Sequence, residues 1–343
     1  MNFIDMSFKR SGYEVELQYS ILFECALGIA MITYPKIKDK LDKPAYYWDQ
    51  LRENLSDSLE KELQYCQEHN TWKILLQILH SQDFDSLSNF LTYISNLSDQ
   101  QLKYLSLPYL EESQQKLRYL ASQGDMDAMD QMILACKHHL FFPQMIHFLS
   151  EVDLSELRGH LIAVMEGWYA EVVEKDSEAI TNLLKRDYAE KQKMLEKTPY
   201  EKVVEWAVGE EYKPEPNISK VLLIPHKIYR PWTIQANLEG TKVFYYPISQ
   251  NSLSDDDEVE SLALLYKALG DEKRLKIMKL LYEKERSLKE ITEILAIGKT
   301  TVHHHLAILK SAHIVKVKES TYTLIHHSLS RLEPMLIDYL RKG

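Results

Sequence analysis

One short segment near the C-terminus gathers side chains that can hydrogen-bond to a nucleic acid. Its polar members are Lys299, Thr300, Thr301, His303 and His304. Ammonium and hydroxyl groups at the start of a helix suit phosphate oxygens, and hydroxyl and imidazole groups can also read base edges. Val302, Leu306 and Leu309 form an apolar stripe at helical spacing on the opposite face. The pattern predicts a helix over residues 299–310 that exposes one face and buries the other.

The histidines and cysteines are the residues that could act as metal ligands. Three consecutive histidines stand at 303–305 and two more at 326–327. Adjacent helical residues point about 100° apart, so three in a row cannot converge on one ion. The cysteines Cys25, Cys66 and Cys136 form no CxxC pair. We therefore expect buried thiols, no metal site and no cofactor.

Signatures of catalysis are missing from the sequence. It has no P-loop, GxGxxG, HExxH, GxSxG or closely spaced carboxylate motif. We therefore expect that the protein is not an enzyme. An enzyme that carries its own regulatory segment remains an alternative.

The elements before residue 299 must hold the polar helix in place. Ser287 and Glu290 form a capping box, in which the serine satisfies the third helical amide and the glutamate reaches back to the serine amide. The helix that they start runs to about Leu295, and Ala296-Ile-Gly298 makes a tight turn into the polar helix. The unit is a helix-turn-helix.

Flanking segments extend this unit on both sides. Residues 261–281 predict two short amphipathic helices separated at Gly270-Asp271, where Asp271 suits an N-cap. Residues 314–325 alternate between apolar and polar and predict a hairpin, the wing. Helical spacing returns over 328–340.

The segments ALGDEKRLKIMKLL and SLKEITEILAIGKTTVHHHLAILKSAHIVKVKE, followed by the short hairpin, resemble the winged helix of the ArsR-type bacterial transcription regulators. The order and spacing match over about 80 residues. The region before it resembles a long N-terminal domain of unknown function found on some of these regulators. Ala296 and His313 stand where glycine is usual, and His303 where serine is usual, so an operator sequence does not transfer from the family.

The resemblance implies how the unit would contact double-stranded DNA. Lys299 and Thr300 suit phosphates, whereas Thr301, His303 and His304 are placed for base edges. The wing residues would anchor the unit to the neighbouring backbone or minor groove. The candidate DNA-binding residues are Ser287, Lys289, Lys299, Thr300, Thr301, His303, His304, Lys310, Lys316, Lys318, Ser320, Thr321 and Tyr322.

The resemblance also implies a homodimer that pairs through the first and last helices of the unit. The apolar candidates are Leu262, Leu265, Leu269, Leu329, Leu332, Leu336 and Leu340. The alternative is that these stripes pack only within one subunit. Many relatives sense metals through a cysteine pair or through histidines on the last helix. This chain has neither, so we do not expect metal sensing.

The rest of the chain accounts for most of its 343 residues, of which 45% are hydrophobic and 27% charged. Helical periodicity dominates, as in residues 48–63 and 154–172. Short β-prone runs over about 13–18 and 219–248 predict a small sheet.

These patterns predict a mostly α (α+β) protein. Residues 1–250 form a large helical domain with a small sheet, and 259–343 form the winged helix-turn-helix. The polar, acidic residues 251–258 are typical of a linker between the two.

Charge is divided unevenly between the two domains. The net charge is −10, but residues 257–343 carry about 15 basic against 12 acidic side chains, which leaves about −13 for the remainder. A unit of only about +3 predicts modest nonspecific affinity for DNA and strong dependence on salt.

The N-terminal domain is larger than dimerisation requires, so we expect it to sense a small-molecule effector or a partner. The candidate pocket residues are Tyr212, His226, Tyr229, Arg230, Trp232 and Tyr245, and the alternative is ordinary sheet core. No secretory signal and no membrane-spanning run is visible, which favours a cytoplasmic protein without a membrane partner. A scaffold whose winged helix binds protein is the remaining alternative.

Overall fold

The structure is a computed structural model. It describes residues 12–34, 38, 41, 43, 45–209, 211–213, 215, 217–230, 232–248, 255–312, 314–318, 320–325, 329 and 332–341. Most described residues are helical, and two small sheets complete the fold, which confirms the predicted mostly α (α+β) class.

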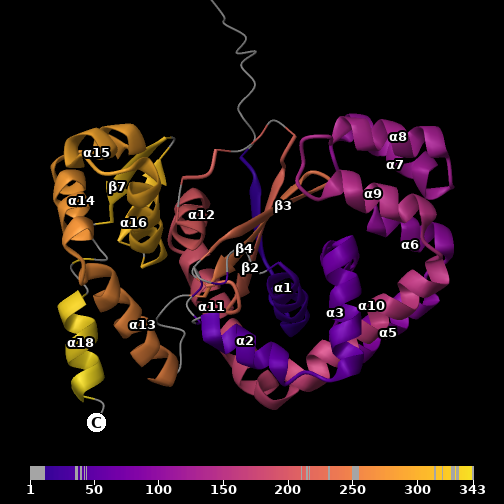
Figure 1. Ribbon diagram of the computed structural model, residues 1–343, viewed down its shortest axis with the longest axis horizontal. Helices are drawn as coiled ribbons and strands as arrows, with labels where there is room; N and C mark the ends of the chain where they lie inside the picture. The colour runs from indigo at the N-terminus through magenta and orange to yellow at the C-terminus, as the bar shows by residue number, and fades with distance from the viewer. Residues whose placement is uncertain are drawn as a thin grey trace, which may run out of the picture.

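Helices build most of the N-terminal domain, and α1 (Ile21–Thr33) lies at its centre. Twelve of its thirteen residues are buried, because four helices pack around it: α3 (Asp57–His69), α4 (Trp72–Leu79), α10 (Leu154–Trp168) and α11 (Ser177–Leu195). Figure 1 shows α5 to α10 as a curved arm on the side of the sheet away from the C-terminal helices. The helices after α1 are α2 (Ala45–Glu53), α3 (Asp57–His69), α4 (Trp72–Leu79), α5 (Leu87–Asn96), α6 (Asp99–Ser106), α7 (Gln115–Ser122), α8 (Met126–Ala135), α9 (Phe142–Glu151), α10 (Leu154–Trp168), α11 (Ser177–Leu195) and α12 (Tyr200–Val208).

The helical periodicity over residues 48–63 predicts one helix, but two helices form there. Helix α2 ends at Glu53 and α3 starts at Asp57, after Ser56, whose hydroxyl accepts a hydrogen bond from the Leu59 amide. Both helices turn their apolar residues to the same core, so the hydrophobic spacing persists across the break. The cap, rather than the spacing, marks the boundary.

A four-stranded sheet joins the start of the chain to its middle. Its strands are β1 (Glu14–Leu17), β2 (Lys220–His226), β3 (Ile234–Leu238) and β4 (Thr241–Pro247), in the order β1-β2-β4-β3. Strands β1, β2 and β4 run parallel, and β3 is antiparallel to β4. The pairing of β1 with β2 confirms that residues 13–18 return to the sheet.

Both faces of this sheet are buried, which explains the nearly unbroken apolar runs in β2 and β4. Leu222 and Tyr245 lie in the large core around α1, whereas Leu223 and Tyr246 lie in a second core with α12. The carboxyl ends of three parallel strands therefore meet at one edge, beside the start of α1.

The C-terminal unit has its own hydrophobic core, which includes Ile277, Ile291 and Val302. Its elements are α13 (Asp255–Leu269), α14 (Glu272–Glu283), β5 (Arg286–Ser287), α15 (Leu288–Leu295), α16 (Lys299–Ser311), β6 (Val315–Lys318), β7 (Thr321–Leu324) and α18 (Leu332–Arg341). The second sheet has the order β5-β7-β6. Strand β5 was not predicted, because two residues are too short for a hydrophobic pattern.

The predicted linker differs from the structure. Helix α13 begins at Asp255, so residues 255–258 are helical, whereas residues 251–254 lie outside the described part of the chain. Elsewhere in the described chain, Cys25, Cys66 and Cys136 are buried free thiols, as predicted. No helix among the described residues is both long and apolar enough to cross a bilayer.

Candidate nucleic-acid interface

The capping box forms at the start of α15 as predicted. The Ser287 amide and hydroxyl both donate to a Glu290 carboxylate oxygen, at 2.7 and 2.8 Å, and the Glu290 amide donates to the serine oxygen. These bonds hold the pKa of Glu290 below its ordinary value. The Ser287 hydroxyl, a candidate DNA contact, is thus engaged in capping the start of α15.

The turn between α15 and α16 carries backbone strain. Ala296 has a φ of 52°, in the left-handed region that favours glycine, and Gly298 caps α16. The tight turn was predicted, and glycine is the residue usual at position 296 in the family. The chain needs this backbone conformation at residue 296 to turn from α15 into α16. The Cβ atom of alanine makes the conformation strained.

Helix α16 separates its residues into two faces. Val302, Leu306 and Leu309 are buried in the core of the unit. On the other face, Lys299, Thr300, His303 and His304 are exposed, and Thr301 is half-buried beside them. The polar groups at the start of α16 are therefore free to meet a ligand, in the arrangement that reads a DNA groove.

His305 belongs to neither set. It is 8% exposed, and its Nδ1 atom lies 3.8 Å from an oxygen of Asp271, the N-cap of α14. Burial lowers the pKa of this imidazole, which favours its neutral form. Among the described residues no three acidic, histidine or cysteine side chains converge as a metal site would require.

Arg274 anchors α14 to α13. Its guanidinium donates to the carbonyl oxygens of Ala268 and Lys267, at 2.6 and 2.7 Å, and lies 3.9 Å from Asp271. The side chain is buried, and its N–H groups satisfy carbonyl oxygens in the last turn of α13. This arginine is held inside the unit and does not offer its charge to a phosphate.

The wing places its candidate residues in different settings. Lys316 on β6 donates to the Glu205 carboxylate of α12, at 2.6 Å, and so joins the wing to the N-terminal domain. Tyr322 is half-buried and packs against the core of the unit instead of extending from the wing tip. Ser320 is exposed, and the Thr321 hydroxyl lies 3.5 Å from Glu285. The side chain of Lys318 lies outside the described residues.

The two remaining candidate lysines lie on helices. Lys289 is exposed on α15, with its amino group 3.9 Å from Glu293. Lys310 is half-buried near the end of α16, away from the polar residues at its start.

The candidate dimer residues fall into three groups. Leu262 and Leu265 are 5% and 4% exposed within a single chain. Leu269, Leu329, Leu332 and Leu336 are half-buried, and Leu340 is 67% exposed. Only the second and third groups leave apolar surface for a second subunit.

The predicted ligand pocket is largely core. His226 is fully buried and its Nε2 atom lies 3.0 Å from the Trp232 carbonyl oxygen, while the Tyr245 hydroxyl meets His80 at 2.6 Å. Tyr229 and Arg230 are also buried, Tyr212 and Trp232 half-buried. His226 and Tyr245 lie toward the carboxyl ends of β2 and β4, whereas Tyr212 packs beside Tyr13 in the other core.

A pocket of about 320 Å³ lies instead beside the end of β1 and the start of α1, and none of the predicted pocket residues lines it. Its acidic residues, Asp83 and Asp85, come from the loop between α4 and α5, and Tyr188 comes from α11. The sequence carried no signal for it, because the residues come from three distant segments. The sequence also carried no signal that Glu205 would pair with Lys316 of the wing.

A helix-turn-helix followed by a wing, with a polar recognition helix held on its own core, defines a winged-helix DNA-binding protein. The family model for "Bacterial regulatory protein, arsR family" matches residues 271–317. The chain is also 40% identical over 72 residues to the "Uncharacterized HTH-type transcriptional regulator MJ1325" of Methanocaldococcus jannaschii, a match over 20% of this chain and 81% of that protein. No solved structure matches the chain. The chain belongs to the ArsR family and is a DNA-binding transcriptional regulator.

Proposed function

We propose that the protein is a repressor that binds a near-palindromic operator as a homodimer. The observation that carries this is the exposed polar face at the start of α16, with Thr301, His303 and His304 at the positions that reach base edges. In a two-fold dimer the two copies of α16 would enter successive major grooves about 34–36 Å apart.

The dimer surface is formed by α13 and α18, which pack side by side at one end of the molecule (Figure 1). The Tyr266 hydroxyl donates to the Leu332 carbonyl oxygen and ties the two helices together. Val259, Tyr266, Tyr339 and Leu340 are large apolar residues exposed on these helices. A second copy would cover this apolar surface, and the half-buried leucines beside it.

The N-terminal domain modulates DNA binding through its contact with the wing. A lysine that donates to a carboxylate at 2.6 Å cannot use the same proton donors on a phosphate. Glu205 therefore competes with the DNA backbone for Lys316. A ligand or partner that moves α12 would change the affinity of the protein for DNA. The protein acts in the cytoplasm and performs no catalysis of its own.

The proposal is tested by fluorescence anisotropy of the full-length protein on its own promoter DNA at two salt concentrations. The variant Thr301→Ala/His304→Ala should lose selective binding, because these side chains contact bases. His147→Ala, an exposed histidine on α9, is the matched control and should bind as the native protein does. Equal binding to promoter and unrelated DNA, unchanged in the double variant, would contradict the proposal and favour a scaffold whose winged helix binds protein.

A further inference from the structure

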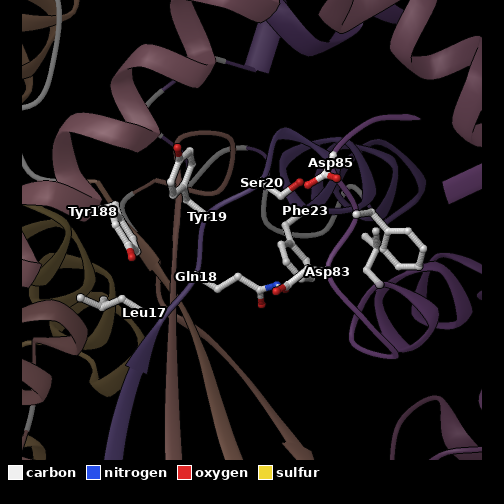
Figure 2. A pocket seen from close by; sticks show the side chains of 10 residues that line it. Leu17, Gln18, Tyr19, Ser20, Phe23, Asp83, Asp85 and Tyr188 are labelled. Carbon is white, nitrogen blue, oxygen red and sulfur yellow. The ribbon is translucent and has the colours of Figure 1, made fainter. Parts of the chain in front are cut away.

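The pocket beside α1 combines negative charge with aromatic walls. Asp83 and Asp85 are exposed carboxylates on its rim, and Figure 2 shows them across the pocket from Tyr19 and Tyr188. The two tyrosine rings lie 5.0 Å apart between centroids, and the Phe23 and Phe84 rings also line the space. Among the described lining residues there is no lysine or arginine.

We infer that this pocket binds a small organic ammonium cation. Aromatic faces attract ammonium groups through the ring quadrupole, and carboxylates attract them by their opposite charge, with charge-assisted hydrogen bonds where the ammonium group carries N–H donors. A volume of about 320 Å³ is at the lower end of the range for small-molecule sites, so the ligand is compact. The position also fits, because ligands of parallel sheets bind outside the carboxyl ends of the strands.

The other ligand classes fit less well. An anion could meet the start of α1, but the helix end carries only about half a positive charge, against two carboxylates. The Ser20 side chain already caps this helix by accepting from the Leu22 amide. A metal ion would need a third strong ligand, and the described residues show no such cluster. The Gln18 amide donates to one Asp83 oxygen at 2.5 Å, which orients this carboxylate and leaves its second oxygen for the ligand.

A chain of contacts runs from the pocket to the wing. Asp187 directly precedes Tyr188 in α11. Its carboxylate accepts hydrogen bonds from the Lys191 amino group at 3.1 Å and from the Tyr246 hydroxyl at 2.8 Å. The Lys191 amino group lies 4.0 Å from the centre of the Trp206 ring on α12. Trp206 adjoins Glu205, the partner of the wing lysine. An effect of the cation on DNA binding would follow this route, and that effect rests on the proposed function.

Calorimetric titration of the full-length protein without DNA tests the site by itself. Choline should bind, and 3,3-dimethylbutanol, its uncharged isostere, should bind at least about tenfold more weakly. Asp83→Asn/Asp85→Asn should weaken choline binding by about tenfold or more, because two negative charges beside the quaternary ammonium are lost. Asp130→Asn, which neutralises an exposed carboxylate on α8, should leave choline binding unchanged.

Three results would overturn the assignment. They are equal binding of choline and its isostere, equal weakening by Asp130→Asn, and no binding of choline at millimolar concentration. The comparison of the two ligands needs no variant, so it holds even where a variant fails to fold. Because the titration contains no DNA, a failure of choline to bind would not contradict the DNA-binding proposal. Likewise, a failure to bind DNA would not contradict the assignment of the pocket.

Discussion

Replacing Glu205 by glutamine removes the charge that holds Lys316 of the wing against α12. The pair joins side chains that are 18% and 31% exposed, so solvent screens it in part. Exposed ion pairs contribute about 0.2–1 kcal/mol, and a dimer breaks two of them, which gives about 0.4–2 kcal/mol. We expect Glu205→Gln to bind operator DNA about 2- to 30-fold more tightly than the native protein.

The same substitution should steepen the salt dependence of binding. In the native protein Lys316 exchanges a carboxylate for a phosphate, so few counterions are released. In the variant, Lys316 is free before binding, and each phosphate contact adds about −0.9 to the slope of log affinity against log salt, or about −1.8 for a dimer. Anisotropy titrations at four salt concentrations measure both quantities.

Glu201→Gln is the matched control, because it removes the same charge from an exposed position on the same helix. Equal affinity gains in the two variants would show that general charge repulsion, and not the pair with Lys316, opposes DNA. No gain in Glu205→Gln would refute the competition between α12 and the phosphate backbone. A further check is Lys316→Ala, which should weaken binding and cancel the effect of Glu205→Gln in the double variant.

Three further outcomes follow from single residues. Ala296→Gly should stabilise the C-terminal unit by up to about 1 kcal/mol, because glycine adopts a positive φ without strain; slower hydrogen exchange in α15 and α16 measures this, and faster exchange would contradict it. Burial raises the pKa of Glu24 to about 7. At a pH between the ordinary glutamate pKa and 7, the native state therefore keeps a proton that the unfolded state has lost. The free energy of unfolding falls as the pH rises through this range. Urea unfolding at pH 5 and pH 8 should show this loss in the native protein and not in Glu24→Gln, whose side-chain oxygen can still accept from the Lys227 amide; parallel pH profiles would refute it. Arg274→Met should destabilise the unit by about 1–3 kcal/mol, since the Ala268 carbonyl oxygen loses its partner and the Lys267 carbonyl oxygen keeps only the Gly270 amide. Thermal unfolding compared with Lys276→Met, at an exposed position of the same helix, tests it.

The C-terminal unit was predictable because its signals are local. A capping box, a tight turn and a stripe at helical spacing each involve residues within a few positions of one another. The Ser287 cap, the turn at 296–298 and the buried face of Val302 were placed correctly for this reason. The break between α2 and α3 was missed because a core that both helices share keeps the hydrophobic spacing in phase.

The site was predicted less completely than the fold. The exposure of His303 and His304 followed from the helical period, but the engagement of Lys316 by Glu205 did not. The two residues are 111 positions apart, and nothing in either segment distinguishes this pair from any other lysine and glutamate. Most of the predicted pocket residues are core residues instead. Composition alone does not distinguish an aromatic cavity wall from an aromatic core such as that around Tyr245.

The sequence by itself determined the helix-turn-helix, its wing, its family and the uneven division of charge, since each depends on residue types at short spacing. Tertiary structure decided which polar groups remain available to a ligand. It placed β1 beside β2, brought Asp83 and Asp85 to face Tyr188, and set α12 against the wing. These contacts depend on how distant segments pack, and packing is a property of the whole core.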